Sequence, residues 1–398
     1  MMIPHGINNH HKQTNLTIAA NILSNTTTNT PTNTANILSN ITNQNPTAQV
    51  KMGYMKTRYD YFDLTVPFTP LPKQGHLSKI DPEYVAVEPA IRKGYAALHD
   101  LPDFPAVRAV AGDPDAVMPP GGPDRYKDVV TELIDIPTRD GTLIELKVYK
   151  SPNVNKNAVL MYRMHGGGWS LGRHEVDGVD NVYAATNLDI IVVSVDYRLA
   201  PEYPFPTPIN DCYDGLLWCK NNAERLGVDP ERIILSGGSA GAQLAASLAL
   251  DCLRDGITGV IAQVLHFPPT CHVKFFPREK YEYGSYIQNK DEAVLSTLSM
   301  ETVLDAYVPD AKPDYRHSPL LAESHKGLPP TLIQCGGLDV LRDDAFAYAE
   351  ALKNDDVDVE FYCYAGFPHW FAALLPHTSQ SVEFFERYNK FLAKHAAK

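Results

Sequence analysis

The sequence predicts an α/β protein built on a mostly parallel sheet of about eight strands, with helices on both faces of that sheet. Three observations carry this prediction. Short apolar runs alternate with longer helical patterns along most of the chain. The later runs are continuous stretches of Val, Ile and Leu, as expected of parallel strands whose two faces are both covered. Two of the runs end in glycine-rich segments, which are typical of turns at the edge of such a sheet.

The elements follow one another in the order that this fold requires. We expect strands at 130–136, 143–149, 158–164, 189–195, 232–236, 260–266, 331–335 and 358–364. We expect helices at 177–186, 207–226, 240–254, 342–353 and 380–394, and a further helical segment around Tyr84–His99.

Two segments outside this alternation suggest a lid. Residues 268–315 are polar, aromatic and irregular, and residues 60–124 combine helical segments with a proline-rich connector. We predict one α/β domain over 60–398, in which 60–124 and 268–315 together contribute a helical lid.

The first fifty residues differ in composition from the rest of the chain. They contain 11 Asn and 10 Thr. Such a tract cannot bury enough apolar surface to offset the entropy lost on ordering, so we predict that 1–55 is disordered. The tract is free of acids and rich in hydroxyl groups, which leaves an organelle-targeting role open.

Charge and cysteine content exclude several classes of protein. The chain has 35 Lys and Arg against 47 Asp and Glu, a net charge of −12, which argues against a nucleic-acid-binding surface. No apolar run approaches the roughly 20 residues of a membrane span. The six cysteines include no C-x-x-C pair, and no Cys/His cluster resembles a zinc site. We therefore expect no metal, no cofactor, reduced thiols and a cytoplasmic location.

The glycine-rich segment Gly237–Gly241 indicates a nucleophilic serine. Ser239 follows an apolar strand and precedes a helical pattern that starts at Ala240. This order of strand, tight turn and helix presents a serine hydroxyl at the sheet edge, and so sharp a turn needs small neighbours. The alternative is a glycine-rich turn in which the serine is incidental.

A serine hydroxyl becomes a nucleophile only when a base takes its proton, and an acid must orient that base. His369 lies in a turn-rich loop directly after the last expected strand, and Asp339 follows the strand before it. The carboxyl ends of parallel strands meet at one edge of a sheet, so both side chains are expected beside Ser239. His377 is the reserve candidate for the base, and the alternative role for Asp339 is a helix N-cap.

A second glycine-rich segment supplies hydrogen-bond donors for such a serine. His165–Gly168 reads His-Gly-Gly-Gly and follows an expected strand, and consecutive glycines let the backbone turn N–H groups toward a ligand. We predict that the amides of Gly167, Gly168 and Ala240 form an oxyanion hole. A phosphate-binding loop is the alternative, but no Lys-Ser/Thr pair or ribose-binding acid is suitably placed near this segment.

These motifs together resemble the hormone-sensitive-lipase-like branch of the α/β-hydrolases. The resemblance covers roughly 125–395 and rests on His-Gly-Gly-Gly-Trp at 165–169, Tyr-Arg-Leu-Ala-Pro-Glu at 197–202 and Gly-Gly-Ser-Ala-Gly at 237–241. It implies a carboxylesterase that works through an acyl-enzyme, with structural roles for Glu202 and Asp211. Its implied site residues are the nucleophile Ser239, the acid Asp339, the base His369 and the oxyanion donors Gly167, Gly168 and Ala240.

The chain departs from the pattern of that branch at three positions near the site. The residue before the nucleophile is usually acidic in the branch, and here it is Gly238. Ala242 replaces a frequent glycine, and Pro368 precedes the base. None of these changes removes a catalytic group, but Gly238 alters the electrostatics expected beside Ser239.

The expected partner is a small-molecule ester. Members of the branch are similar in using a lid to set acyl-chain length. The aromatic side chains of the predicted lid suggest small-to-medium apolar or aromatic esters, unless they only form the core of the lid. They are Phe275, Phe276, Tyr281, Tyr283 and Tyr286.

Two other functions stay open. One is a ligand receptor on the same fold, since the gibberellin receptor resembles this fold without the base. The other is a lyase or acyltransferase in a biosynthetic pathway, because a fold and a site do not by themselves choose the substrate.

Overall fold

The computed structural model describes residues 53–62, 73–110 and 118–397. The predicted disordered tract, 1–55, lies outside the described residues except for its last three positions. The described residues divide into two compact units. The smaller comprises 53–55 and 85–110, and the larger comprises the rest.

The smaller unit contains two helices, α5 (Glu88–His99) and α6 (Phe104–Val110). The Tyr54 ring packs on Phe104 with the ring centroids 4.8 Å apart. The helical segment expected around Tyr84–His99 is confirmed by α5, and a separate short helix, α4 (Pro82–Val85), precedes it. Pro89 occupies the first turn of α5, where a proline is tolerated.

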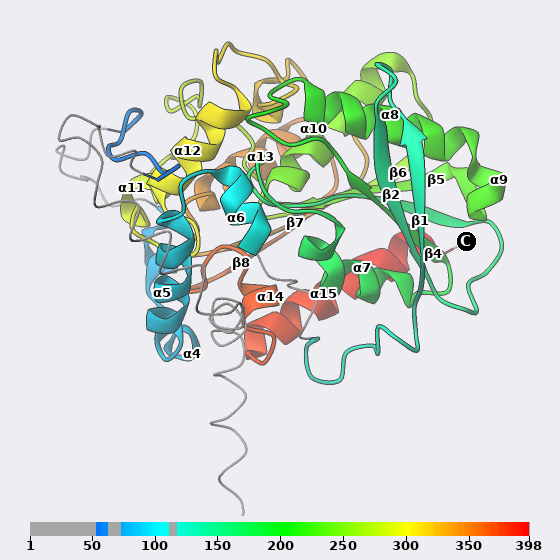
Figure 1. The fold of residues 1–398 in the computed structure, drawn as a ribbon, viewed down its shortest axis with the longest axis horizontal. Coiled ribbons are helices and arrows are strands. Elements are labelled where there is room, and N and C mark those ends of the chain that lie inside the picture. The colour runs from blue at the N-terminus through cyan, green and yellow to red at the C-terminus, as the bar shows by residue number, and fades with distance from the viewer. Residues whose placement is uncertain (1–52, 63–72, 111–117, 398) are drawn as a thin grey trace, which may run out of the picture. The chain divides into compact units, whose positions relative to one another are not determined.

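The larger unit is built on an eight-stranded sheet in the order β1-β2-β4-β3-β5-β6-β7-β8. The strand β2 runs antiparallel to both of its neighbours, and all other pairs are parallel (Figure 1). All eight predicted strands are confirmed. Their bounds are Val130–Pro137, Leu143–Lys150, Ala158–Met164, Ile190–Asp196, Val228–Gly238, Val260–His266, Thr331–Gly336 and Val359–Tyr364, for β1 to β8 in chain order.

Helices cover both faces of this sheet, as predicted. Figure 1 shows α8, α10 and α13 on one face and α7 and α15 on the other. Their bounds are α7 Gly178–Ala185, α8 Thr207–Asn221, α10 Ala240–Asp255, α13 Arg342–Asn354 and α15 Ser379–Ala396. Shorter elements are α9 Ala223–Leu226, α14 Phe371–Leu374 and the 3-10 helices η1 Gly75–Ser78, η3 His174–Asp177 and η4 Pro319–Leu321.

The expected helix 207–226 is interrupted. It breaks at Asn222, between α8 and α9, where the side-chain amide of Asn222 donates to the carbonyl of Trp218 at 2.9 Å. An asparagine that binds its own backbone offers the chain an alternative to the next helical turn.

The insertion 268–315 is more regular than its sequence predicts. It contains α11 (Ser285–Gln288) and α12 (Thr297–Tyr307). The irregular assignment is therefore wrong for α12. The side chain of Ser296 accepts a hydrogen bond from the Ser299 amide at 3.1 Å and so forms the N-cap of α12. This N-cap does not stand out in the sequence because it lies in a polar stretch.

The core of the larger unit lies on the central strands. Every residue of β3 is buried, and so are the first six of β4. Continuous burial of this kind explains why these strands read as unbroken apolar runs. All six cysteines lie within the described residues, and none of them forms a disulfide.

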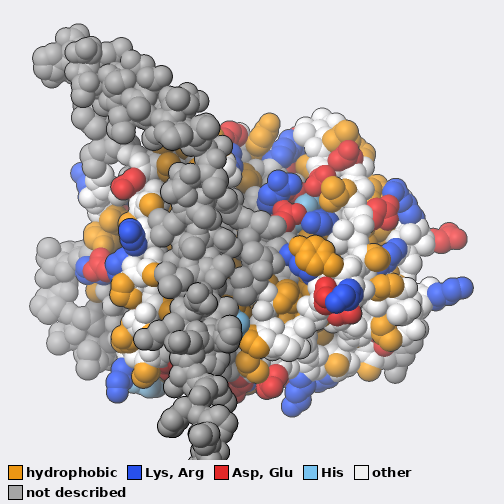
Figure 2. All heavy atoms as spheres, turned by 60° about the horizontal axis from the view of Figure 1, so that its bottom comes forward, with side chains coloured by type: hydrophobic (Ala, Val, Ile, Leu, Met, Phe, Trp, Pro, Cys, Tyr) orange, Lys and Arg blue, Asp and Glu red, His pale blue; other side chains and the backbone are white. Residues whose placement is uncertain are grey.

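Basic and acidic side chains are mixed on the visible face of the molecule. On the face presented in Figure 2, basic and acidic side chains are interspersed instead of gathering by sign. Within the described part of the chain, no helix combines the length and the hydrophobicity that crossing a bilayer would require.

Candidate active site

The serine elbow lies between β5 and α10, at the carboxyl edge of the sheet. Ser239 has φ 53° and ψ −122°, a left-handed backbone conformation that is costly for any residue but glycine. Its amide donates to the carbonyl of His266 at 2.7 Å, which ties the turn to β6. A Cβ on Gly241 would overlap the carbonyl of Met164 on β3, so the helix can approach the sheet only with glycine there.

The predicted base and acid lie beside this serine. The Nε2 atom of His369 is 3.0 Å from Oγ of Ser239, and its Nδ1 atom is 2.6 Å from Oδ2 of Asp339. An ionised carboxylate only accepts, so Nδ1 carries the proton and donates it to Asp339. The other nitrogen then presents a lone pair to the Ser239 hydroxyl. The three predicted side chains form one hydrogen-bonded series.

The series is shielded from solvent. Ser239 is 8% exposed, His369 is 6% exposed and Asp339 is fully buried. Hydrogen bonds that involve an ionised group are stronger in such surroundings than in water. The second carboxylate oxygen of Asp339 accepts from the Leu341 amide at 2.9 Å, which fixes the rotation of the acid.

The predicted oxyanion donors lie on two segments of the same edge. Gly167 has φ 118°, a value open to glycine, and its carbonyl is occupied by the amides of Ser170 and Leu171 at 3.2 and 2.8 Å. Gly168 also has a positive φ of 59°. Ala240 is the first residue of α10, where amides have no partner within the helix and the helix dipole favours negative charge.

His165 braces the glycine loop, as its sequence context suggests. Its Nδ1 atom lies 2.7 Å from the carbonyl of Gly166, and its ring stacks on Tyr197 with centroids 4.2 Å apart. The Tyr197 hydroxyl donates to the carbonyl of His165 at 2.7 Å. The imidazole is fully buried and is held by the segment that follows β4.

The remaining sequence candidates lie elsewhere. His377 is exposed and stands outside the hydrogen-bonded series of Ser239. Asp211 is buried and receives two hydrogen bonds from the Arg198 guanidinium, at 2.7 and 2.9 Å, which fits a structural role. Glu202 is exposed.

The insertion contributes residues that the sequence did not single out. Asn289 is buried and donates from its amide to the carbonyl of Asp339 at 2.9 Å, so the insertion supports the loop of the acid. A Cβ on Gly168 would lie 2.9 Å from a methyl of Val303, which places α12 against the glycine loop. Neither Asn289 nor Val303 is part of a sequence motif, so only the fold shows that they lie near the site.

A buried charged cluster lies beneath the elbow. Arg163 of β3 donates from Nε to Asp177 at 2.8 Å and from Nη1 to the Ser236 hydroxyl at 2.7 Å. Asp180 lies 3.3 Å from the same guanidinium and 2.9 Å from Nδ1 of His266. Burial raises the pKa of Asp177 in spite of the nearby guanidinium. The cluster holds β3, β5, β6 and the start of α7 together below Ser239.

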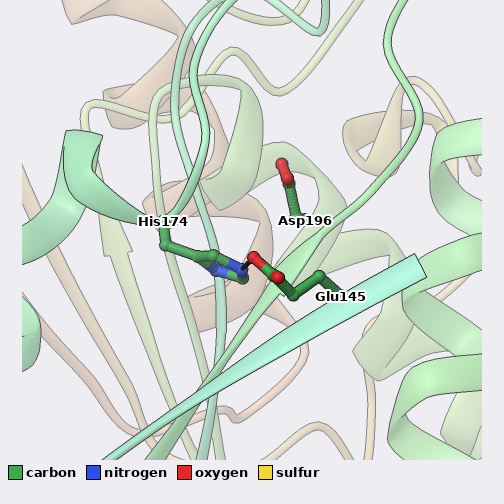
Figure 3. A group of neighbouring side chains, drawn as sticks. All are labelled: Glu145, His174 and Asp196. Atoms are coloured by element: carbon green, nitrogen blue, oxygen red, sulfur yellow. Dashed lines mark ion pairs between the residues drawn. The ribbon is translucent and has the colours of Figure 1, made fainter. Parts of the chain in front are cut away.

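Three further side chains are grouped as metal ligands often are. Nitrogen and oxygen atoms of Glu145, His174 and Asp196 lie within 4.8 Å of one another. Figure 3 shows Glu145 reaching the ring of His174, while the carboxylate of Asp196 points away from both. Nε2 of His174 lies 3.4 Å from Glu145, and Nε2 of His165 lies 3.6 Å from Asp196. Each carboxylate has an imidazole partner, so we assign the group to two carboxylate–imidazole pairs.

The burial of His174 predicts an acid-sensitive fold. Burial lowers the pKa of His174 to about 4, against about 6.5 in an unfolded chain. Between these values the unfolded chain binds a proton that the folded chain excludes, so stability falls as the pH falls through this window. This one group should remove about 2 kcal/mol between pH 7 and pH 5.

The free energy of unfolding in urea at pH 7 and pH 5 checks this prediction. His174→Gln should lose about 2 kcal/mol less than the natural chain over that interval, whereas His377→Gln, at an exposed position, should match it. Equal losses in all three proteins would contradict the assignment.

The fold and the site define an α/β hydrolase with its serine in a strand–turn–helix elbow. A family model described as alpha/beta hydrolase fold matches residues 161–373. The chain belongs to this family, and the predicted fold and family are confirmed.

Several named relatives of the chain are esterases. It is 33% identical over 303 residues to versiconal hemiacetal acetate esterase of Dothistroma septosporum, covering 74% of this chain and 88% of that protein. It is 38% identical over 225 residues to carboxylesterase NlhH of Mycobacterium tuberculosis, covering 55% and 68%. The crystal structure of esterase LipW from Mycobacterium marinum superposes with a TM-score of 0.68 at 26% identity, covering 82% of this chain and 98% of that one. These similarities support the prediction of an ester-hydrolysing enzyme.

Proposed function

We propose that this protein is a serine carboxylesterase that hydrolyses small-molecule esters through an acyl-enzyme. The observation that carries the proposal is the series of two hydrogen bonds from Asp339 through His369 to Ser239. The names of the similar proteins support the same chemistry. A receptor built on this fold would not need the imidazole at hydrogen-bond distance from the serine hydroxyl.

Acylation begins with the proton of Ser239. Nε2 of His369 takes this proton while Oγ attacks the carbonyl carbon of the ester. The carbonyl oxygen becomes an oxyanion that the amides of Gly167, Gly168 and Ala240 would stabilise, each such donor being worth about 10²–10³ in kcat. When the tetrahedral intermediate collapses, the alkoxide leaves with the proton from His369, and the acyl group stays on Oγ.

Deacylation repeats these steps with water. His369 takes a proton from a water molecule whose oxygen attacks the acyl carbonyl, and then returns the proton to Oγ of Ser239 as the carboxylic acid leaves. Asp339 stays ionised throughout and stabilises the imidazolium that forms in each half-reaction.

We propose that the preferred acyl group is short. Val303 lies against Gly168, so an apolar side chain stands at the predicted oxyanion donors. The lid aromatics favour the core interpretation, because Phe276 stacks on Tyr283 at 3.7 Å and Phe62 stacks on Tyr286 at 4.9 Å. Because these aromatic side chains pack against one another, they leave little apolar space for a long acyl chain.

Hydrogen bonds within the larger unit support the proposed lid. The amide of Lys56 donates to the Thr302 hydroxyl at 3.0 Å, and the amide of Asp60 donates to Glu301 at 2.9 Å. Residues 56–60 are therefore tied to α12 of the insertion. We propose that these segments cover the site, and that the unpaired cysteines reflect a cytoplasmic setting.

Turnover of p-nitrophenyl esters of graded acyl length tests the proposal. We expect hydrolysis of the acetate and butyrate, with kcat/KM for butyrate at least about tenfold above that for the dodecanoate, because a short pocket rejects extra methylene groups. Heat-denatured protein supplies the blank rate. Absence of turnover by folded protein would contradict the esterase proposal, and a preference for the dodecanoate would contradict the short pocket.

A further inference from the structure

Two glycines of the active site lie against one indole ring. A Cβ on Gly238 would lie 2.7 Å from both Cη2 and Cζ3 of Trp370, and a Cβ on Gly166 would lie 2.9 Å from the same two atoms. Real Cβ atoms essentially never approach other atoms closer than 3.0 Å. The six-membered ring of Trp370 therefore occupies the space that side chains at both positions would need.

The backbone of Trp370 is held in an unfavourable conformation. Trp370 has φ 61°, in the left-handed region, and it directly follows His369. Phe267 packs near the indole, at 6.1 Å between ring centroids, and has a φ of 53° itself. Such conformations persist only where the surroundings fix them. The contact of the indole with the two glycines is one such constraint, and it acts one residue away from the proposed base.

A small cavity adjoins the indole. It is lined by Arg163, Asp180, His266, Phe267, Trp370 and Phe384. A side chain at Gly238 would push the ring out of its place, and the backbone of His369 would follow.

A carboxylate from another part of the chain also lies close to Gly238. Oδ1 of Asp177 would lie 3.4 Å from a Cβ on Gly238. Asp177 is fully buried and already pairs with Arg163. An acidic side chain at Gly238 would therefore meet a clash with Trp370 and a second carboxylate in a buried site, which is unfavourable for both charges.

We propose that Trp370 is a positioning residue whose indole locks the loop of the base against the serine elbow and the glycine loop. Gly238 and Gly166 lack side chains because this ring occupies their space. The inference rests on the proposed function, since it takes His369 as the base. It goes beyond that function by naming the side chain that sets the distance from His369 to Ser239.

A compensating pair of substitutions tests this role. Gly238→Ala should lower kcat for p-nitrophenyl butyrate on the order of 10- to 100-fold, because small misplacements of a reacting group are costly. KM should change far less, and the pH dependence of kcat/KM should shift with the displaced base. Gly238→Ala/Trp370→Phe, whose smaller ring leaves room for the added methyl group but still packs against the loop, should recover most of the lost kcat. Trp370→Phe, which keeps a ring, should stay within about threefold of the natural chain.

Gly141→Ala is the matched control. Gly141 also has a positive φ, of 83°, but nothing lies within 4 Å of its Cβ position. This variant should lose stability without changing kcat or the pH profile. The proposal is overturned if Gly238→Ala keeps kcat within about twofold of the natural value, or if adding Trp370→Phe deepens its loss instead of relieving it.

Tryptophan fluorescence separates a failure of this inference from a failure of the proposed function. The chain has three tryptophans, so subtracting the spectrum of Trp370→Phe isolates the emission of Trp370. We expect this emission to shift when Gly238→Ala is introduced, whether or not the protein hydrolyses the assay ester. An unchanged emission would overturn the indole contact, whereas a shift without any esterase activity would count against the proposed function alone.

Discussion

Ser239→Ala should lower kcat for p-nitrophenyl butyrate on the order of 10⁴- to 10⁶-fold. The hydroxyl is the group that the proposed mechanism acylates, and His369 lies 3.0 Å from it. Alanine lacks the oxygen but keeps the small size that the elbow needs, so the fold should survive. Steady-state kinetics with a thermal unfolding scan checks both expectations.

The control for this substitution is an exposed serine. Ser324 lies in a surface loop and its hydroxyl bonds to Asp355 at 3.1 Å. Ser324→Ala should leave kcat unchanged. If Ser239→Ala kept a rate near that of the natural chain, a different nucleophile would have to carry the reaction.

Asp339→Asn should lower kcat by about 10⁴-fold. Oδ1 of the asparagine can still accept from the Leu341 amide, so its NH₂ group would face Nδ1 of His369. A donor at that place moves the imidazole proton to Nε2, and the imidazole then cannot accept the proton of Ser239. The geometry of the site should remain while its chemistry is lost.

A second Asp→Asn variant separates this effect from the loss of any carboxylate. Asp214 forms a surface ion pair with Arg139 at 2.7 Å. Asp214→Asn should keep kcat within about twofold of the natural value, since a surface ion pair contributes little. Similar rates for the Asp339 and Asp214 variants would contradict the orienting role of Asp339.

The features that could be predicted from the sequence are those that local patterns encode. The eight strands are apolar runs with clear ends, and the elbow needs glycines at fixed positions around Ser239. Asp339 and His369 could be chosen among many acids and histidines because each follows its own strand, and parallel strands end at one edge.

The features that escaped prediction depend on contacts between distant parts of the chain. Arg163 stands in a strand that reads as apolar, and its partners Asp177 and Asp180 belong to the next helical segment. Trp370 looks like any aromatic in a loop until the fold brings it onto Gly238. No local pattern records the contact of Trp370 with Gly238, because the two residues are separated by more than a hundred positions.

The identity of the residue that becomes covalently modified tests the central claim most directly. A fluorophosphonate forms a stable bond to an activated serine oxygen with loss of fluoride, and mass spectrometry of the digested protein locates the adduct. We predict one adduct per chain, on the peptide that contains Ser239, with esterase activity lost in the same proportion. Full inactivation with Ser239 unmodified, or with the adduct on another residue, would contradict the account.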